Sequence, residues 1–77
     1  MDDLIRLTKQ IIEYVDSGDL MSCYSLFEAE IRSIVESLEE DTSELVRLWK
    51  IQRGYVDEED WAGVLENIEN IREIVYA

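Results

Sequence analysis

Apolar residues recur in residues 20–38 at the spacing of one face of an α-helix. Their steps of four and three residues stack side chains on one stripe of a helix, and strand alternation does not produce them. The stripe consists of Leu20, Tyr24, Phe27, Ile31, Ile34 and Leu38, with Cys23 and Val35 beside it. Charged residues occupy the opposite side: Glu28, Arg32, Glu36 and Glu39. The pattern predicts an amphipathic helix over residues 20–39 at the centre of a small bundle.

Three further segments show the same period, and we expect helices over about residues 3–17, 43–53 and 58–75. Their predicted core residues are Leu4, Leu7, Ile11, Tyr14 and Val15 in the first, Leu45, Leu48, Trp49 and Gln52 in the third, and Trp61, Val64, Leu65, Ile68, Ile71 and Val75 in the fourth. Short connections favour antiparallel neighbours. The 77 residues are therefore predicted to form one all-α domain, residues 1–77, folded as a small antiparallel four-helix bundle. The third helix is expected to be short and is a candidate to cross the others.

Glycine and acidic residues mark the expected ends of the first helices. Gly18 suits the left-handed conformation after the first helix, and Asp19 suits the N-cap of the second. Asp41, three residues before Glu44, resembles a capping box that would start the third helix near residue 42. Each signal places a helix boundary in a polar stretch.

The boundary between the third and fourth helices is expected at Gly54. Residues 55–56 would then link the helices, and the four acids of residues 57–60 would begin the fourth helix, where the positive end of the helix dipole favours them. Alignment of the four predicted helices with one another reveals no internal repeat.

The chain is strongly acidic, with 19 Asp and Glu against seven Lys and Arg and a formal net charge of −12. This balance repels DNA, RNA and anionic lipid surfaces, because binding to phosphate depends on cationic side chains. No run of about 18 apolar residues is present, and Met1 is followed by two aspartates rather than by a basic and then apolar signal region. We therefore expect a soluble cytoplasmic protein that binds neither nucleic acid nor membranes directly.

Few residues of this chain suit catalysis or metal binding. There is no histidine and one cysteine, so the usual zinc ligand sets are absent and no intramolecular disulfide can form. Cys23 lies beside an apolar stripe without a nearby base, which favours a buried structural thiol. No calcium-loop pattern follows Asp57, and the three glycines stand too far apart for a phosphate loop. The sequence predicts a protein that is not an enzyme and has no cofactor or metal.

An acidic ridge near the C-terminus is the strongest candidate for a function. It is expected to comprise Glu59, Glu66, Glu69 and Glu73, at helical spacing and with few cations near them in sequence. The predicted partner-binding residues are Tyr55, Asp57, Glu58, Glu59, Asp60, Trp61, Glu66, Glu69 and Glu73. The acids would steer a basic protein to this surface, and an aromatic anchor such as Tyr55 or Trp61 would then be buried. A nuclease, toxin or nucleic-acid-binding protein has such a basic surface. The leading hypothesis is therefore an inhibitor or immunity-type protein that masks it by charge mimicry.

Homo-oligomerisation of a structural or adaptor module is the alternative, with the acidic surface serving only solubility. A domain of this size has a thin stability margin. Four apolar residues lie off the main stripes and are the predicted contacts of a homodimer: Met21, Leu26, Val46 and Ile51. Gly63, inside the fourth helix, would permit the close approach of another chain. Arg72 lies on the apolar face of that helix and requires a carboxylate, water or an interface.

Overall fold

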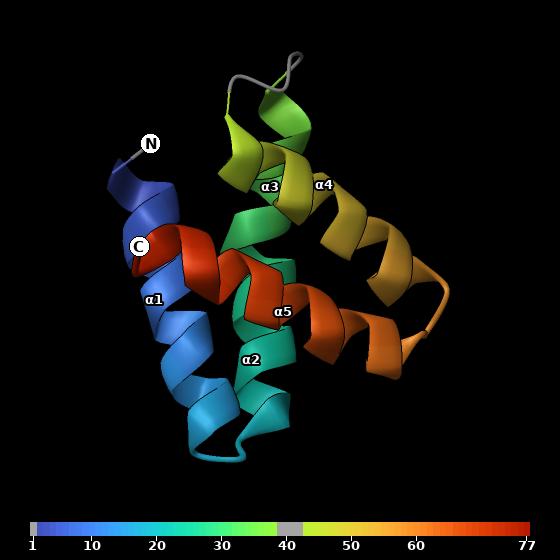
Figure 1. The fold of residues 1–77 in the computed structure, drawn as a ribbon. Coiled ribbons are helices and arrows are strands. Elements are labelled where there is room, and N and C mark those ends of the chain that lie inside the picture. The colour runs from blue at the N-terminus through green and yellow to red at the C-terminus, as the bar shows by residue number, and fades with distance from the viewer. Residues whose placement is uncertain (1, 39–42) are drawn as a thin grey trace. The chain divides into compact units, whose positions relative to one another are not determined.

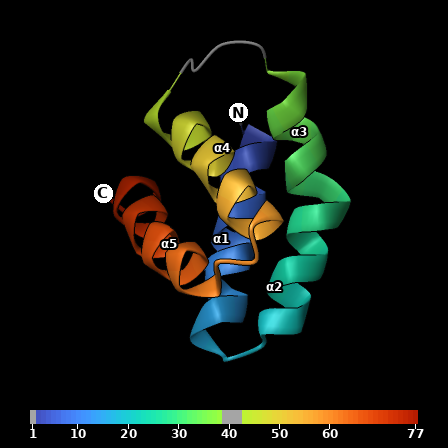
Figure 2. The same ribbon diagram turned by 90° about the vertical axis from the view of Figure 1, so that its right-hand side faces the viewer.

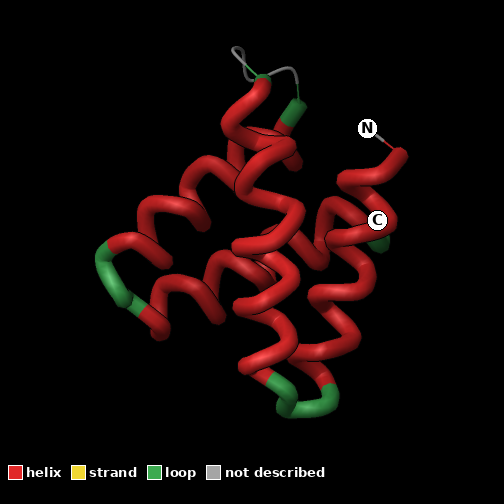
Figure 3. The backbone as a smooth tube through the Cα atoms, turned by 180° about the vertical axis from the view of Figure 1, so that it is seen from behind, coloured by secondary structure: helices red, strands yellow, loops and turns green. Residues whose placement is uncertain are grey.

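The computed structural model describes residues 2–38 and 43–77, and every regular element within them is a helix (Figure 3). This confirms the all-α prediction. The chain divides into two compact units, Met1–Ser37 and Leu38–Ala77, and each contains one helical hairpin (Figure 1). The antiparallel four-helix bundle in one domain stays a prediction.

The first hairpin consists of α1 (Asp2–Asp16) and a second helix with a π-helical segment in its middle. The second helix runs through α2 (Leu20–Leu26), the π-helical segment η1 (Phe27–Ile31) and α3 (Arg32–Ser37). α1 packs against α2 and η1, and the two arms of the hairpin run in opposite directions (Figure 1). The predicted helix end at Glu39 lies outside the described residues.

The second helix buries only two residues of the predicted stripe, together with the two predicted to lie beside it. Its buried positions lie at successive steps of four: Cys23, Phe27, Ile31 and Val35. Leu20 and Tyr24, both predicted to be core, are 50% and 44% exposed. Three steps of four residues drift around a regular α-helix by about 120°. The wider π-helical turn holds an additional residue and keeps the series on one face, which the prediction from a uniform period could not include.

α1 buries a broad face that includes a threonine. Its buried residues are Leu4, Leu7, Thr8, Ile11 and Ile12. Thr8 tolerates complete burial because its Oγ1 donates a hydrogen bond of 2.6 Å to the Leu4 carbonyl oxygen. Tyr14 and Val15, both predicted to be core residues, are only partly buried.

The second hairpin consists of α4 (Glu44–Asp57) and α5 (Trp61–Val75), which pack against each other (Figure 2). Ser43 is the N-cap of α4, with its hydroxyl oxygen accepting a hydrogen bond from the Val46 N–H (3.3 Å). The capping role predicted for Asp41 lies outside the described residues. α4 continues past Gly54, so the expected helix end there is wrong. Val56 is buried in the last turn, and its burial outweighs the cost of about 1 kcal/mol for glycine within a helix.

The two hairpins turn through the same backbone motif. The N–H groups of Gly18 and Asp19 donate to the carbonyls of Val15 and Tyr14, and those of Glu59 and Asp60 donate to the carbonyls of Val56 and Tyr55. This is a Schellman motif, with Gly18 (φ 79°) and Glu59 (φ 57°) in the left-handed conformation. Asp19 and Asp60 then cap the following helices. The two hairpins therefore turn in the same way although no internal repeat was expected.

Candidate protein-interaction surface

The four acids of residues 57–60 form the turn between α4 and α5. Asp57 is the last residue of α4, Glu58 is its C-cap, and Asp60 is the N-cap of α5. The prediction that all four acids begin a helix is therefore wrong. Only Asp60 serves as an N-cap, with its carboxylate accepting a hydrogen bond of 3.0 Å from the Gly63 N–H. Asp57 and Glu58 lie at the negative end of the α4 dipole, so the dipole does not offset their repulsion.

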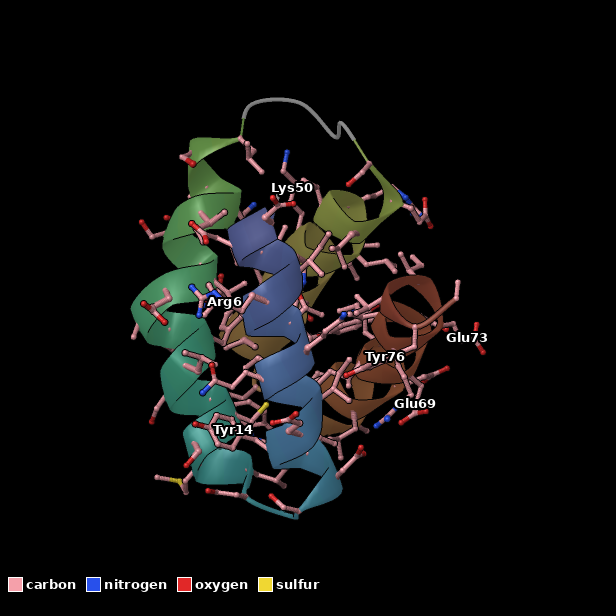
Figure 4. All side chains as sticks on the ribbon, turned by 90° about the vertical axis from the view of Figure 1, so that its left-hand side faces the viewer. Arg6, Tyr14, Lys50, Glu69, Glu73 and Tyr76 are labelled. Carbon is pink, nitrogen blue, oxygen red and sulfur yellow. The ribbon has the colours of Figure 1, made fainter. Side chains whose placement is uncertain are left out.

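Three glutamates of the predicted ridge are exposed on α5 and are called the acidic row here: Glu66, Glu69 and Glu73. The side chains of Glu69 and Glu73 extend outward from the helix (Figure 4). Glu69 also pairs with Arg72 across 3.6 Å, and a carboxylate partner is one of the three arrangements expected for Arg72. Such a solvent-accessible pair contributes at most about 1 kcal/mol. Glu59 lies in the turn and does not belong to the row.

Two large apolar side chains are exposed beside the acidic row. Trp61 is 49% exposed and Leu65 is 41% exposed, although both were predicted to be core residues. A step of four residues places Trp61, Leu65 and Glu69 along one side of α5. This finding keeps Trp61 as a candidate anchor. It adds Leu65, which sequence reasoning missed because Leu65 lies at the edge of the apolar stripe.

Tyr55 does not fit the role of an exposed anchor. Its side chain is partly buried, and its ring lies against Gly63 in the neighbouring helix. A Cβ atom at Gly63 would lie 2.6 Å from the Cδ1 atom of Tyr55, so only glycine allows this approach. The close contact expected from another chain is thus made by Tyr55 of the same hairpin.

A buried polar pair holds α4 and α5 together beneath the exposed face of α5. The Asn67 Nδ2 group donates hydrogen bonds of 2.9 Å to the Gln52 Oε1 atom and to the Leu48 carbonyl oxygen. The Gln52 Nε2 group donates to the Val64 carbonyl oxygen (3.3 Å). Gln52 was placed on the buried face by its spacing, whereas Asn67 was not recognised. The available signal was its position at helical spacing between Val64 and Ile71.

The predicted oligomer contacts differ widely in exposure. Met21 is 78% exposed, Ile51 is 37% exposed and Leu26 is partly buried. Val46 is fully buried, so its predicted role as a surface contact is wrong. Helix α4 buries a face wide enough to include Val46, Leu45 and Trp49 together.

Cys23 is buried, as predicted for a structural thiol. Burial raises the pKa of the Cys23 thiol, and the negative charge of Asp19 raises it further. Over residues 2–38 and 43–77, no group of three or more acidic or cysteine side chains is placed to hold a metal ion. The helices in these ranges are all too short or too polar to cross a membrane.

Comparison with known proteins gives no assignment for this surface. No protein-family model, curated protein or solved structure matches the chain. The function is therefore inferred from the chemistry of the second hairpin.

Proposed function

We propose that the protein binds a basic surface of another protein through α5 and the turn that precedes it. The observation that carries this proposal is the exposed apolar pair Trp61 and Leu65 beside the acidic row. Exposed apolar side chains next to charges of one sign provide both an anchor and a means of steering. The protein acts by occupying the partner's surface, without catalysis or a cofactor.

Three acids of the second hairpin, Glu58, Glu59 and Glu66, are not required by its fold. Counted from the N-caps Asp19 and Asp60, the positions of Glu58, Glu59 and Glu66 correspond to Ser17, Gly18 and Ser25. The first hairpin forms the same turn without these acids. Glu59 also occupies a left-handed conformation, which costs about 1–2 kcal/mol for a residue with a side chain. Acidic residues that do not stabilise the fold support a binding role.

Binding would proceed in two steps. Long-range attraction first raises the association rate, and this attraction weakens with salt because the Debye length is about 8 Å at physiological ionic strength. Burial of Trp61 and Leu65 then slows dissociation. Full burial of an exposed large apolar side chain contributes about 1.5–3 kcal/mol, and about half of that remains to be gained by these half-exposed side chains. Nucleases, toxins and nucleic-acid-binding proteins have basic surfaces that hold phosphate. We propose that the protein masks such a surface in the cytoplasm, as an inhibitor or immunity-type protein.

Charge reversal with a matched control tests this proposal. The variant E66K/E69K/E73K reverses the acidic row, and E13K/E30K/E36K applies the same charge change to exposed acids of the first hairpin. Each is used to capture proteins from the native lysate at low and high salt. We expect the wild type and the control to retain one basic protein that salt releases, and the row variant to lose it. Equal loss from both variants would show that only net charge matters, and no loss from either would refute the proposal.

Homo-oligomerisation remains a second candidate, because one specific observation favours it. Met21 is 78% exposed, and it lies beside the exposed side chains of Leu20 and Tyr24 in α2. Native mass over a range of protein concentrations separates the two functions. A discrete homo-oligomer that Met21→Glu dissociates, without a salt-sensitive partner, would replace the inhibitor proposal.

A further inference from the structure

We infer that the chain is a tandem duplication of one helical hairpin, and that η1 results from one inserted residue. Residues 3–28 align with residues 44–69 at a constant offset of 41, and residues 30–36 align with residues 70–76 at an offset of 40. Ala29 is left unpaired. Thirteen of the 33 aligned pairs are identical: Leu4/Leu45, Arg6/Arg47, Leu7/Leu48, Lys9/Lys50, Tyr14/Tyr55, Val15/Val56, Asp16/Asp57, Asp19/Asp60, Glu28/Glu69, Ile31/Ile71, Arg32/Arg72, Ile34/Ile74 and Val35/Val75.

The aligned residues also make equivalent interactions. Schellman turns, capping aspartates and ion pairs of this spacing are common in helices, so the support comes from their coincidence at aligned positions. The Schellman turns and the capping aspartates coincide in the alignment. An ion pair of three-residue spacing begins each hairpin, Asp3 with Arg6 and Glu44 with Arg47. The exposed apolar pairs coincide as well, with Leu20 and Tyr24 aligned to Trp61 and Leu65.

The π-helical segment lies where the offset changes. One additional residue in an α-helix rotates all following residues by about 100° and would turn Ile31 away from the buried face. The Arg32 N–H donates instead to the Phe27 carbonyl oxygen, five residues back, so a wider turn absorbs the residue. Ile31 and its counterpart Ile71 are consequently both fully buried.

The spacing of one ion pair differs between the two hairpins by the same single residue. Arg32 pairs with Glu28 four residues earlier (2.8 Å), whereas the aligned Arg72 pairs with Glu69 three residues earlier (3.6 Å). The same two side chains meet in both hairpins, and the spacing differs by the one additional residue. Sequence comparison without a gap finds the nine identical pairs up to Glu28/Glu69 and misses the four that follow, because no identical pair follows Glu28 at the offset of 41.

The copies differ in ways that fit separate roles. The buried polar pair Gln52 and Asn67 aligns with the apolar pair Ile11 and Leu26. In the acidic row, Glu66 and Glu73 align with serines, Ser25 and Ser33. The second copy thus carries the additional negative charge.

Deletion of Ala29 from the full chain tests the inference. We expect the helix to become regular, as α5 is. The melting temperature should stay within about 4 °C of the wild type, which corresponds to a change in stability of less than about 1 kcal/mol. The matched control is deletion of Asn70, the corresponding site in a helix without a π turn. This deletion rotates Ile71 off the buried face, and we expect a loss of more than 10 °C or no cooperative unfolding. Equal losses in the two variants would overturn the inference.

An insertion provides the reverse test and does not depend on the deletion variant folding. Alanine inserted after Glu69 should recreate the η1 register in α5. The control is alanine inserted after Arg47 in α4, where neither hairpin has a π turn. We expect the first insertion to lower the melting temperature by less than half as much as the second. An insertion after Glu69 that is tolerated no better than the control would refute a π-helical insertion site.

Discussion

Exchange of the buried pair Gln52 and Asn67 for apolar residues provides a sharp test of how the second hairpin is held together. The first hairpin has Ile11 and Leu26 at the aligned positions, so the exchanges are Gln52→Ile and Asn67→Leu, made singly and together. Each single variant leaves one polar partner behind, and the double variant leaves neither. The stability of the double variant should therefore differ from the sum of the single effects.

The magnitude follows from the hydrogen bonds that each change removes. Asn67→Leu removes two bonds of 2.9 Å and leaves the Gln52 Oε1 atom without a donor in a side chain that is 2% exposed. An unsatisfied buried polar group costs about 1–3 kcal/mol, whereas replacing both partners by apolar groups is nearly neutral. We expect each single variant to lose about 1–3 kcal/mol, the double variant to lose less than either, and a coupling energy of about 1–3 kcal/mol between the sites.

Urea unfolding of the wild type and three variants at one pH measures this coupling as a double-mutant cycle. Asn70→Leu is the control, because it makes the same exchange at an exposed site of α5 and should change stability by less than about 0.5 kcal/mol. If the stability change of the double variant equals the sum of the two single changes within about 0.5 kcal/mol, the two side chains do not interact, because independent sites are additive to that degree. This result would refute the buried pair.

Three further predictions concern single positions. Gly63→Ala should destabilise the protein by about 1–3 kcal/mol, because its Cβ would lie 2.6 Å from Tyr55 Cδ1. Gly54→Ala, with no side chain within 4 Å, should stabilise it by up to about 1 kcal/mol. Similar changes in melting temperature for Gly63→Ala and Gly54→Ala would contradict the close contact between Gly63 and Tyr55. Glu59→Gly should raise stability by about 0.5–1 kcal/mol by relieving the left-handed conformation, and a loss in urea unfolding would argue against it. Because burial raises the pKa of Cys23, the unfolded thiol ionises first, and stability should fall as pH rises above about 8.5. Cys23→Ala should reduce that slope, and an unchanged slope would count against a buried thiol.

Local sequence signals were sufficient for several parts of the fold. The helical period and the Gly18 turn placed the first helix within one residue of α1 at each end. The capping role of Asp19 was also predicted, because an aspartate side chain satisfies the N–H groups of whichever helix follows. The exposure of Glu66, Glu69 and Glu73 followed from their spacing, since charged side chains remain in water.

The boundary between α4 and α5 could not be predicted from local signals. Glycine disfavours a helix by only about 1 kcal/mol, and the burial of Val56 outweighs this preference. Because α4 ends after Gly54 rather than at it, the acids of residues 57–60 lie in a turn and not at the predicted helix start. It also placed Tyr55 against Gly63, which removed Tyr55 from the predicted surface.

The sequence by itself determined that this protein is helical and acidic, because helical period and charge are properties of each segment alone. Tertiary structure decided which side chains are buried. The burial of Asn67, the exposure of Trp61 and Leu65, and the π turn that keeps Ile31 buried all depend on the neighbouring helix of the same hairpin. Packing energies of several kcal/mol outweigh the helical preferences of individual residues, which are below about 1 kcal/mol. The inferred repeat is present in the sequence, and the tertiary structure locates its one-residue gap at η1.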